Sequence, residues 1–167
     1  MYILLVVNMV EILVTYYTRG GSTERLAQAV ADGVRSAGGI ATLKPVDEVD
    51  ASDLPGYDGI IIGSPVYFGT MASEVKKLID DSIAVRGRLE GKVGAAFTTS
   101  RHRTGGKETT LLSILEAMLI HGMVVCGDPI SVGGHYGAAG ADAAGVGEGV
   151  ALGARVARVA ETNMCAE

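Results

Sequence analysis

Short apolar runs alternate along the chain with longer segments in which apolar residues recur every three or four positions. The apolar runs predict five strands, at residues 12–16, 40–44, 59–63, 93–98 and 123–126. Several of these runs are apolar throughout, which is typical of strands buried on both faces. The longer segments predict four helices, at residues 22–37, 73–83, 108–121 and 150–160.

This alternation of strand and helix predicts a parallel sheet with helices on both faces. Five strands favour the order 2-1-3-4-5, which gives a three-layer α/β sandwich. The chain shows no internal repeat and no linker, and its 167 residues correspond to a single domain, 1–167.

The N-terminal segment is nearly all apolar and reads MYILLVVNMVEILVTYY. It lacks the basic start and the cleavage site of a signal peptide. It is also short for a membrane span, which needs about 20 apolar residues. We therefore expect no membrane insertion and assign residues 11–17 to the first core strand. Residues 1–8, or at most 1–10, are interpreted as an extra N-terminal segment, with Met9 as a candidate start.

Composition and charge exclude several classes of partner. Apolar residues make up 48% of the chain and charged residues 20%, which fits a compact globular protein. The net charge is -5 and basic residues form no stripe, so nucleic acid and anionic membranes are not expected partners. Cys126 and Cys165 lack metal-ligand spacing, which predicts free thiols in a reducing compartment, the cytoplasm, and no metal site.

The loop after the first predicted strand has the composition of a phosphate pocket. Ser22 is placed to cap the following helix, whose first N–H groups carry a partial positive charge. Glycines let the backbone close around an anion, and hydroxyl groups can donate to it. Neither a Walker motif nor a dinucleotide motif is present, and an ordinary glycine-rich turn remains the alternative. The predicted phosphate-binding residues are Thr18, Arg19, Gly20, Gly21, Ser22 and Thr23.

The loop after the third predicted strand places two aromatic residues at the same edge of the sheet. Tyr67 and Phe68 suit a planar apolar ligand, and Gly69 lets a backbone N–H approach its ring. Alternatively, the two aromatic side chains fold back as a small satellite core. The predicted ring-binding residues are Ser64, Pro65, Val66, Tyr67, Phe68 and Gly69.

The loop after the fourth predicted strand is rich in hydroxyl groups and contains a glycine pair, which suits the polar edge of a ring. The predicted binding residues here are Thr98, Thr99, Ser100, Thr104, Gly105 and Gly106. Arg101, His102 and Arg103 either pair with a nicotinamide-cofactor phosphate or form a solvated loop tip. Carboxyl ends of parallel strands share one edge, so the three loops together describe a site for flavin mononucleotide, FMN.

Four segments, taken in order and spacing, resemble the flavodoxin-like NAD(P)H:quinone oxidoreductases, the tryptophan-repressor-binding-protein family. They are ILVTYYTRGGSTERLAQAVADG, GYDGIIIGSPVYFGTMASEVKKLID, GKVGAAFTTS with TGGKETT, and HGMVVCG with GGHYGAAG. The resemblance covers about residues 10 to 140. It implies an FMN enzyme that carries two electrons from NADH or NADPH to a quinone, with assembly as a homo-oligomer, a dimer or a tetramer. It also implies that His121 is catalytic, beside the flavin.

The chain departs from the family pattern in three places. The connection between the second and third strands is short, DDSIAVRGRLEGK lacks the tryptophan that often covers the flavin, and TTSRHRTGG is one residue longer. These differences leave the FMN prediction intact, but they leave substrate choice, nicotinamide binding and tetramer geometry open. His121 also has a purely structural alternative, because a histidine at a helix C-terminus interacts favourably with the helix dipole. His135 and Tyr136 either approach the same pocket or form a packed loop.

The predicted activity is ping-pong exchange, in which one open flavin face takes NAD(P)H and then a quinone. The main alternative is a flavodoxin-type one-electron carrier with a protein redox partner. A degenerate domain that has lost its flavin is a further alternative. A phospho-receiver is set aside because Thr18 and Ser64 follow the strands that would carry its aspartates.

Overall fold

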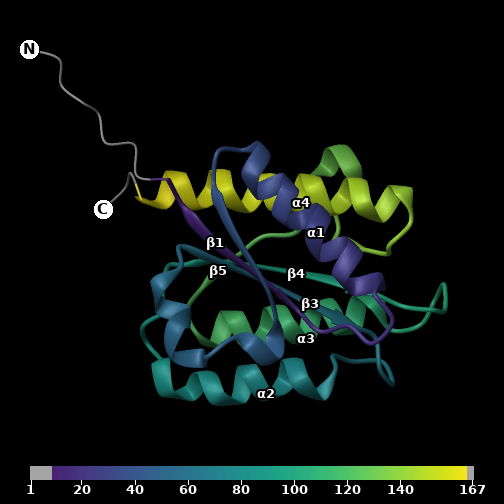
Figure 1. Ribbon diagram of the computed structural model, residues 1–167, viewed down its shortest axis with the longest axis horizontal. Helices are drawn as coiled ribbons and strands as arrows, with labels where there is room; N and C mark the ends of the chain where they lie inside the picture. Colours follow the sequence, from purple (N-terminus) through teal and green to yellow (C-terminus); the bar gives the residue numbers. More distant parts are fainter. Residues whose placement is uncertain (1–8, 165–167) are drawn as a thin grey trace, which may run out of the picture.

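A parallel sheet forms the middle layer of the protein (Figure 1). The computed structural model describes residues 9–164, so the predicted extra segment at residues 1–8 lies outside the described residues. The sheet has the predicted order, β2-β1-β3-β4-β5. Its strands are β1 (Glu11–Tyr16), β2 (Ile40–Pro45), β3 (Gly59–Pro65), β4 (Val93–Thr99), β5 (Val124–Val125) and β6 (Ala138–Ala139).

The fifth position of the sheet is divided between two short strands. β5 pairs with Val93 and Gly94 at the start of β4, whereas β6 pairs with Phe97 and Thr98 near its end. Both lie on the side of β4 that β3 does not occupy. The predicted fifth strand is therefore confirmed but shorter than 123–126, and β6 is an addition that the sequence pattern did not reveal.

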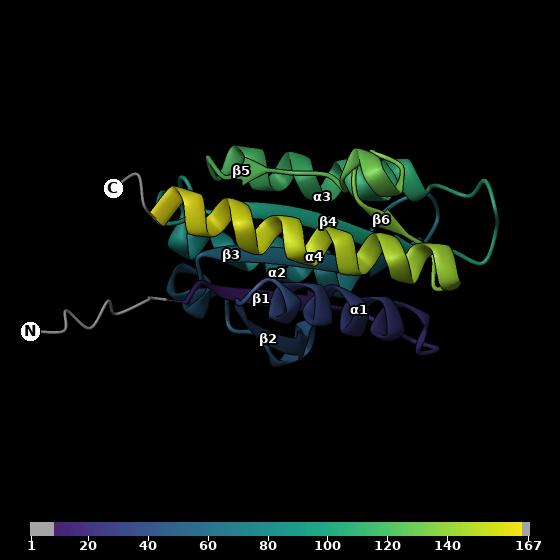
Figure 2. The same ribbon diagram turned by 90° about the horizontal axis from the view of Figure 1, so that it is seen from above.

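Helices cover both faces of the sheet, as predicted (Figures 1 and 2). The α-helices are α1 (Ser22–Ser36), α2 (Ser73–Asp81), α3 (Lys107–Ile120) and α4 (Ala143–Met164). Four short 3-10 helices are η1 (Val46–Glu48), η2 (Ala51–Gly56), η3 (Ser82–Val85) and η4 (Ile130–Val132). Helices α1 and α4 lie together on one face, and α2 and α3 lie on the other (Figure 2).

Strand β1 shows why the apolar runs are continuous. Ile12 and Val14 pack into the core beneath α1 and α4, whereas Leu13 packs into the core beneath α2 and α3. All three side chains are fully buried. Successive side chains of a strand point to opposite faces, so a strand covered on both faces needs apolar residues at every position.

Helix α4 is longer than the predicted helix at residues 150–160. The glycines near its N-terminus explain why the prediction begins too late. A Cβ atom at Gly153 would lie 2.0 Å from the Val30 carbonyl oxygen of α1, and one at Gly33 would lie 2.0 Å from the Val150 oxygen of α4. Glycine weakens isolated helices, so the glycine-rich start of α4 does not look helical in sequence. At Gly33 and Gly153 glycine is required because the two helix backbones touch.

The register of the sheet brings three strand ends to one edge. Tyr16 of β1 lies opposite Gly63 of β3, and Pro65 of β3 lies opposite Thr99 of β4. The loops that follow these strands are therefore neighbours, at the right-hand side of Figure 1. No helix within residues 9–164 is long and apolar enough to cross a membrane.

Candidate functional site

A cavity of about 710 Å³ lies at this carboxyl edge, between the three loops that the sequence singles out. Its volume is within the usual range for small-molecule sites. Its wall contains most of the predicted cofactor-binding residues, together with Arg101. The lining residues are Thr18, Arg19, Gly20, Ser22, Thr23, Pro65, Val66, Tyr67, Thr99, Ser100 and Arg101.

The first loop leads into α1 through a left-handed residue. Gly21, with a φ of 85°, is the N-cap, and Ser22 is the first helical residue, so the prediction that Ser22 caps the helix is wrong. The hydroxyl of Thr18 accepts the Gly21 N–H at 2.9 Å. The first intrahelical bond runs from the Arg25 N–H to the Gly21 oxygen at 3.0 Å, which leaves the preceding N–H groups of the first turn available to an anion.

A buried hydrogen bond ties this loop to the fourth strand. The hydroxyls of Thr23 and Thr99 are 2.8 Å apart. Both side chains are buried, although both residues contribute to the cavity wall. The bond fixes the start of α1 against the end of β4.

The second loop makes a tight turn at Phe68 and Gly69, whose φ angles of 49° and 84° are both positive. Tyr67 and Thr70 exchange backbone hydrogen bonds across the turn, at 2.9 and 3.1 Å. The turn holds the Phe68 side chain fully exposed to solvent. The satellite-core alternative therefore does not apply to Phe68, whose left-handed conformation is uncommon for a bulky residue.

Tyr67 points back toward the first loop. Its ring meets the ring of Tyr17 edge-on, with centroids 6.3 Å apart, and the Arg19 guanidinium carbon lies 5.0 Å from the Tyr67 centroid. Both interpretations of the sequence therefore apply to Tyr67. It packs on Tyr17, as in a satellite core, and it also lines the cavity, where a planar ligand would lie. Arg19 and Tyr67 together join the phosphate-type loop to the aromatic loop.

Two predicted residues brace the loops rather than line the cavity. The Ser64 hydroxyl donates to the Pro65 oxygen and accepts the Ala72 N–H, both at 2.8 Å. The Thr98 hydroxyl donates to the Ser64 oxygen at 2.7 Å. Ser64 and Thr98 are completely buried. These bonds fix where the second loop leaves the sheet.

The third loop packs against the second at its glycines. A Cβ atom at Gly106 would lie 2.7 Å from the Cα atom of Gly69, so only glycine allows this approach, and the Gly106 φ of 70° also favours glycine. The Thr109 hydroxyl donates to the Gly69 oxygen at 2.5 Å. Within the loop, the hydroxyl of Thr104 lies 3.0 Å from His102 Nδ1.

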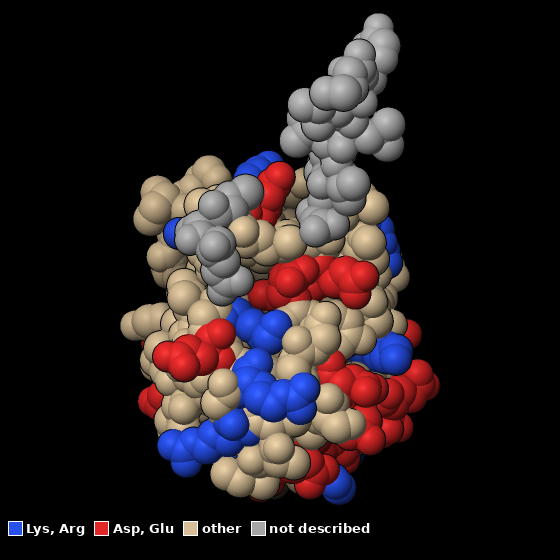
Figure 3. Space-filling model, turned by 90° about the vertical axis from the view of Figure 1, so that its left-hand side faces the viewer, with Lys and Arg blue, Asp and Glu red and all other residues tan. Residues whose placement is uncertain are grey.

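His121 lies at the opposite edge of the sheet from these loops. Helix α3 begins next to Gly106 and has 14 residues, so it carries the chain about 21 Å away before His121. The Gly122 carbonyl beside it accepts the Gly91 N–H just ahead of β4, at the amino edge. Figure 3 shows this edge of the molecule, where Lys and Arg side chains are interspersed with Asp and Glu. Within one chain, His121 and the cavity do not meet.

The environment of His121 favours the neutral imidazole. The Ser82 hydroxyl donates to the Ile79 oxygen at 2.6 Å, so it accepts the proton of His121 Nε2, which lies 2.8 Å away. The buried Nδ1 has no hydrogen-bond partner within residues 9–164. Burial, followed by the charge of Arg86, lowers the pKa of His121 below its ordinary value of 6.5.

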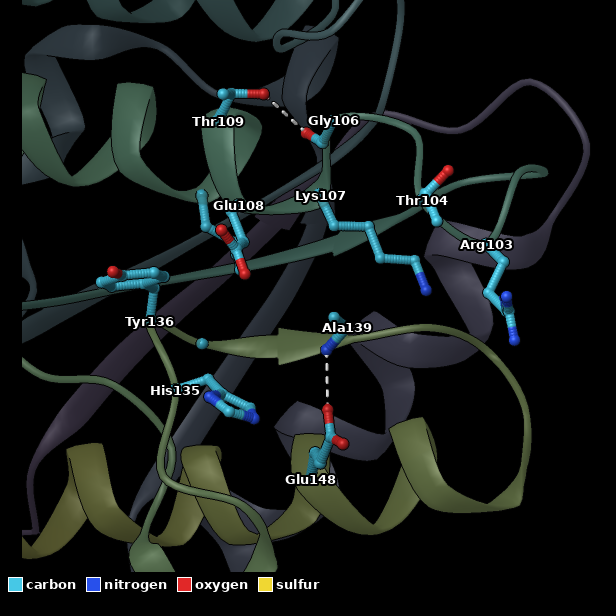
Figure 4. Close-up of a pocket in the computed structure, with 12 residues that line it drawn as sticks. Arg103, Thr104, Gly106, Lys107, Glu108, Thr109, His135, Tyr136, Ala139 and Glu148 are labelled. Carbon is cyan, nitrogen blue, oxygen red and sulfur yellow. Dashed lines mark hydrogen bonds between the residues drawn. The ribbon is translucent and has the colours of Figure 1, made fainter.

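The sequence reasoning missed a second cavity of about 520 Å³, next to the third loop (Figure 4). Thr104 and Gly106 are the predicted site residues that line it. The other lining residues come from the third loop, the start of α3, β6 and the segment before it, and α4, and no motif links them in sequence. His135 and Tyr136 lie here, so the described chain places them beside the third loop and not in the larger cavity.

Comparison with known proteins agrees with the fold. The model of a flavodoxin domain matches residues 13–118, which include β1, β3, β4 and all three loops. The chain belongs to the flavodoxin-domain family. The resemblance read from the sequence segments is thereby confirmed at the level of the family and the fold.

Relatives named NAD(P)H dehydrogenase (quinone) cover most of the chain. The protein from Sinorhizobium fredii is 38% identical over 77% of this chain and 76% of its own length. The protein from Archaeoglobus fulgidus is 38% identical over 92% of this chain and 98% of its own. Among solved structures, a flavodoxin, WrbA-like protein from Agrobacterium tumefaciens superposes with a TM-score of 0.79, at 28% identity over 92% of this chain and 99% of that one.

Proposed function

We propose that this protein is an FMN-dependent oxidoreductase that transfers two electrons from NADH or NADPH to a quinone. The observation that carries the proposal is the meeting of three loops around one 710 Å³ cavity, at the carboxyl ends of β1, β3 and β4. Relatives at 38% to 41% identity are named for this activity. No group of three or more His, Cys, Asp or Glu side chains within residues 9–164 is arranged to hold a metal.

The residues present fit FMN at each part of the cavity. The N-terminal turn of α1 offers free N–H groups beside the Thr18 and Ser22 side chains, which suits a phosphate. Tyr67 and Val66 offer an apolar wall for a planar ring, and Thr99 at the end of β4 and Ser100 after it add hydroxyl groups beside them. The buried polar braces, Ser64 and Thr98, would hold these loops in place without contacting the ligand.

FMN, when bound, supplies the two-electron redox chemistry, and the protein must bind it, orient it and leave one face open. We propose that NAD(P)H and the quinone use that open face in turn. The exposed Phe68 would border it, because Phe68 directly follows Tyr67 of the cavity wall. A cytoplasmic location, where NAD(P)H is available, belongs to the same proposal.

His121 can act in turnover only through a second copy of the chain, because it lies at the far edge of its own sheet. The surface around it supports assembly as a homo-oligomer. Ile83, Leu119 and Ile120 are 66%, 55% and 70% exposed, and Ile83 follows the Ser82 that contacts His121. Light scattering tests this part, and a monomer at micromolar concentration would remove His121 from the proposed machinery.

Two titrations and one kinetic series test the main proposal. FMN should bind the cofactor-free protein at least about tenfold more tightly than riboflavin, because only FMN engages the charge-assisted bonds at α1. Initial rates with varied NADH and benzoquinone should give parallel double-reciprocal lines. Equal affinity for FMN and riboflavin would contradict the phosphate assignment, and intersecting lines would contradict alternate use of one face.

A further inference from the structure

The 520 Å³ cavity beside the third loop is a second ligand compartment built from distant parts of the chain (Figure 4). It lies along β6, with the start of α3 on one side and α4 on the other. Thr104 and Gly106 belong both to its wall and to the turn that borders the proposed flavin site. A ligand that extends past the flavin along this turn would reach the second cavity.

Two cations of the cavity wall, Arg103 and Lys107, have unpaired side chains within the part of the chain that the structure describes. Neither Arg103 nor Lys107 forms a hydrogen bond or an ion pair through its side chain with any residue in 9–164. Both are drawn toward the same end of the cavity as Thr104 in Figure 4. Arginine and lysine side chains of this kind are suited to a phosphate group.

The two carboxylates of the cavity wall, Glu148 and Glu108, differ in their hydrogen bonding. Glu148 of α4 accepts the Ala139 N–H of β6 at 2.9 Å, so it closes the floor of the cavity. The Glu108 carboxylate forms no hydrogen bond with residues 9–164, and it lies between Lys107 and Tyr136 (Figure 4). A free carboxylate in this position suits the hydroxyl groups of a ribose, which donate hydrogen bonds.

The aromatic part of the cavity wall, His135 and Tyr136, is held in place by the buried carboxylate of Asp128. The Asp128 carboxylate accepts the N–H groups of Gly134 and His135, at 3.1 and 2.8 Å, and its side chain is only 2% exposed. These bonds fix the segment that presents His135 and Tyr136 to the cavity. Tyr136 is 46% exposed, so its ring has a face available for stacking.

We propose that this cavity binds the adenylate half of NADH or NADPH while the nicotinamide reaches the flavin. The inference rests on the proposed function and specifies where its electron donor is held. Along the cavity, Tyr136 takes the adenine, Glu108 the ribose, and Arg103 with Lys107 the phosphates nearest the third loop. This order matches the order of groups along a dinucleotide that leads to the flavin.

Steady-state kinetics with full-length and truncated donors test the proposal on the FMN-loaded protein. In the double variant R103Q/K107Q, the KM for NADH or NADPH should rise about tenfold or more, because two charge-assisted contacts are lost. The kcat and the KM for benzoquinone should stay unchanged. Reduced nicotinamide mononucleotide lacks the adenylate half, so wild type and variant should use it equally well.

Matched variants separate charge from stacking. Tyr136→Ala should raise the dinucleotide KM about fivefold or more, and Tyr136→Phe should restore it, since a base stacks on either ring. Arg158→Gln removes an exposed cation of α4 that lines neither cavity, and it should leave every constant unchanged. Calorimetric titration with ADP-ribose should show binding to wild type and to R158Q, and much weaker binding to R103Q/K107Q.

Unchanged dinucleotide constants in R103Q/K107Q and Y136A would overturn the inference and leave the proposed function standing. An equal loss of activity with NADH and with reduced nicotinamide mononucleotide would also overturn the inference. Such a loss would indicate damage to the loop that borders the flavin. Failure of the proposed function has a different signature, in which no nicotinamide donor reduces the bound flavin. The inference then falls with it.

Discussion

The side-chain oxygens of Thr23 and Thr99 lie 2.8 Å apart, which joins α1 to β4 across 76 residues of sequence. Both side chains are buried. Thr23→Val leaves the Thr99 hydroxyl without its partner, so it should lower the free energy of unfolding by about 1–3 kcal/mol. The double variant with Thr99→Val should cost less than the sum of the two single changes. Urea denaturation measures these values, and strict additivity would contradict the coupling. Thr162→Val, exposed on α4, should change stability by less than about 0.5 kcal/mol.

Gly21 and Gly20 form a matched pair in the phosphate-type loop. A Cβ atom added at either residue would have no other atom within 4 Å, but only Gly21 has a positive φ, of 85°. Gly21→Ala should therefore cost about 1–2 kcal/mol through backbone conformation alone and should weaken FMN binding. Gly20→Ala should have little effect on either quantity. FMN titration of the two variants checks the pair, and equal effects would contradict the assigned geometry.

Phe68 holds an unfavourable backbone conformation without burying its ring. Asparagine tolerates a positive φ better than other side chains, so Phe68→Asn should stabilise the cofactor-free protein by up to about 1 kcal/mol. The same change removes an exposed aromatic ring next to Tyr67, which lines the cavity, and should weaken FMN binding. Phe68→Ala loses the ring but keeps the strain, so it should weaken binding without the gain in stability. Destabilisation of the cofactor-free protein by Phe68→Asn would contradict this interpretation.

His121 should make stability depend on pH. Its pKa in the folded protein is lowered, chiefly by burial and then by Arg86, from 6.5. As the pH falls through 6.5, the unfolded chain binds a proton before the folded chain does, so the free energy of unfolding decreases. The decrease ends once the pH falls below the folded pKa. His121→Gln should remove this contribution, so the stability of the wild type relative to the variant should fall on acidification. If the free energies of unfolding of the wild type and the variant change in parallel with pH, the lowered pKa of His121 is contradicted.

Two glycines of α4 should respond in opposite ways to alanine. A Cβ atom at Gly153 would meet the Val30 oxygen at 2.0 Å, so Gly153→Ala should destabilise the protein by about 1–3 kcal/mol or more. A Cβ atom at Gly147 would have no other atom within 4 Å. Gly147→Ala should therefore stabilise the helix by up to about 1 kcal/mol. Thermal unfolding of both variants measures the difference, and a neutral Gly153→Ala would contradict the close contact of α1 and α4.

Much of the fold was predictable because its strands are buried on both faces. The predicted runs at Ile12–Tyr16 and Gly59–Gly63 contain no regular alternation of apolar and polar residues that could be misread. The three loops were predictable as neighbours because parallel strands bring their carboxyl ends to one edge. The short strand β6, only Ala138–Ala139, has no pattern of its own, since its pairing depends on the place that β5 leaves along β4.

The remaining site features depend on tertiary contacts that no local pattern encodes. Ser22 has the usual composition of an N-cap, yet the left-handed turn at Gly21 takes that position. The second cavity needs α4 to return beneath β6, which brings Glu148 to Ala139. The distance of His121 from the loops follows from the direction of α3, because a helix that begins at the carboxyl edge must end at the amino edge.

The most direct test of the central claim is anaerobic mixing of the FMN-loaded protein with NADH or NADPH, followed by benzoquinone. The visible flavin absorbance should bleach rapidly with the nucleotide and return rapidly with the quinone, because both reach the same open face. Dithionite serves as the control for a reducible bound flavin. If dithionite bleaches the flavin but neither nucleotide does, the protein is not an NAD(P)H:quinone oxidoreductase, and a one-electron carrier served by a protein partner takes its place.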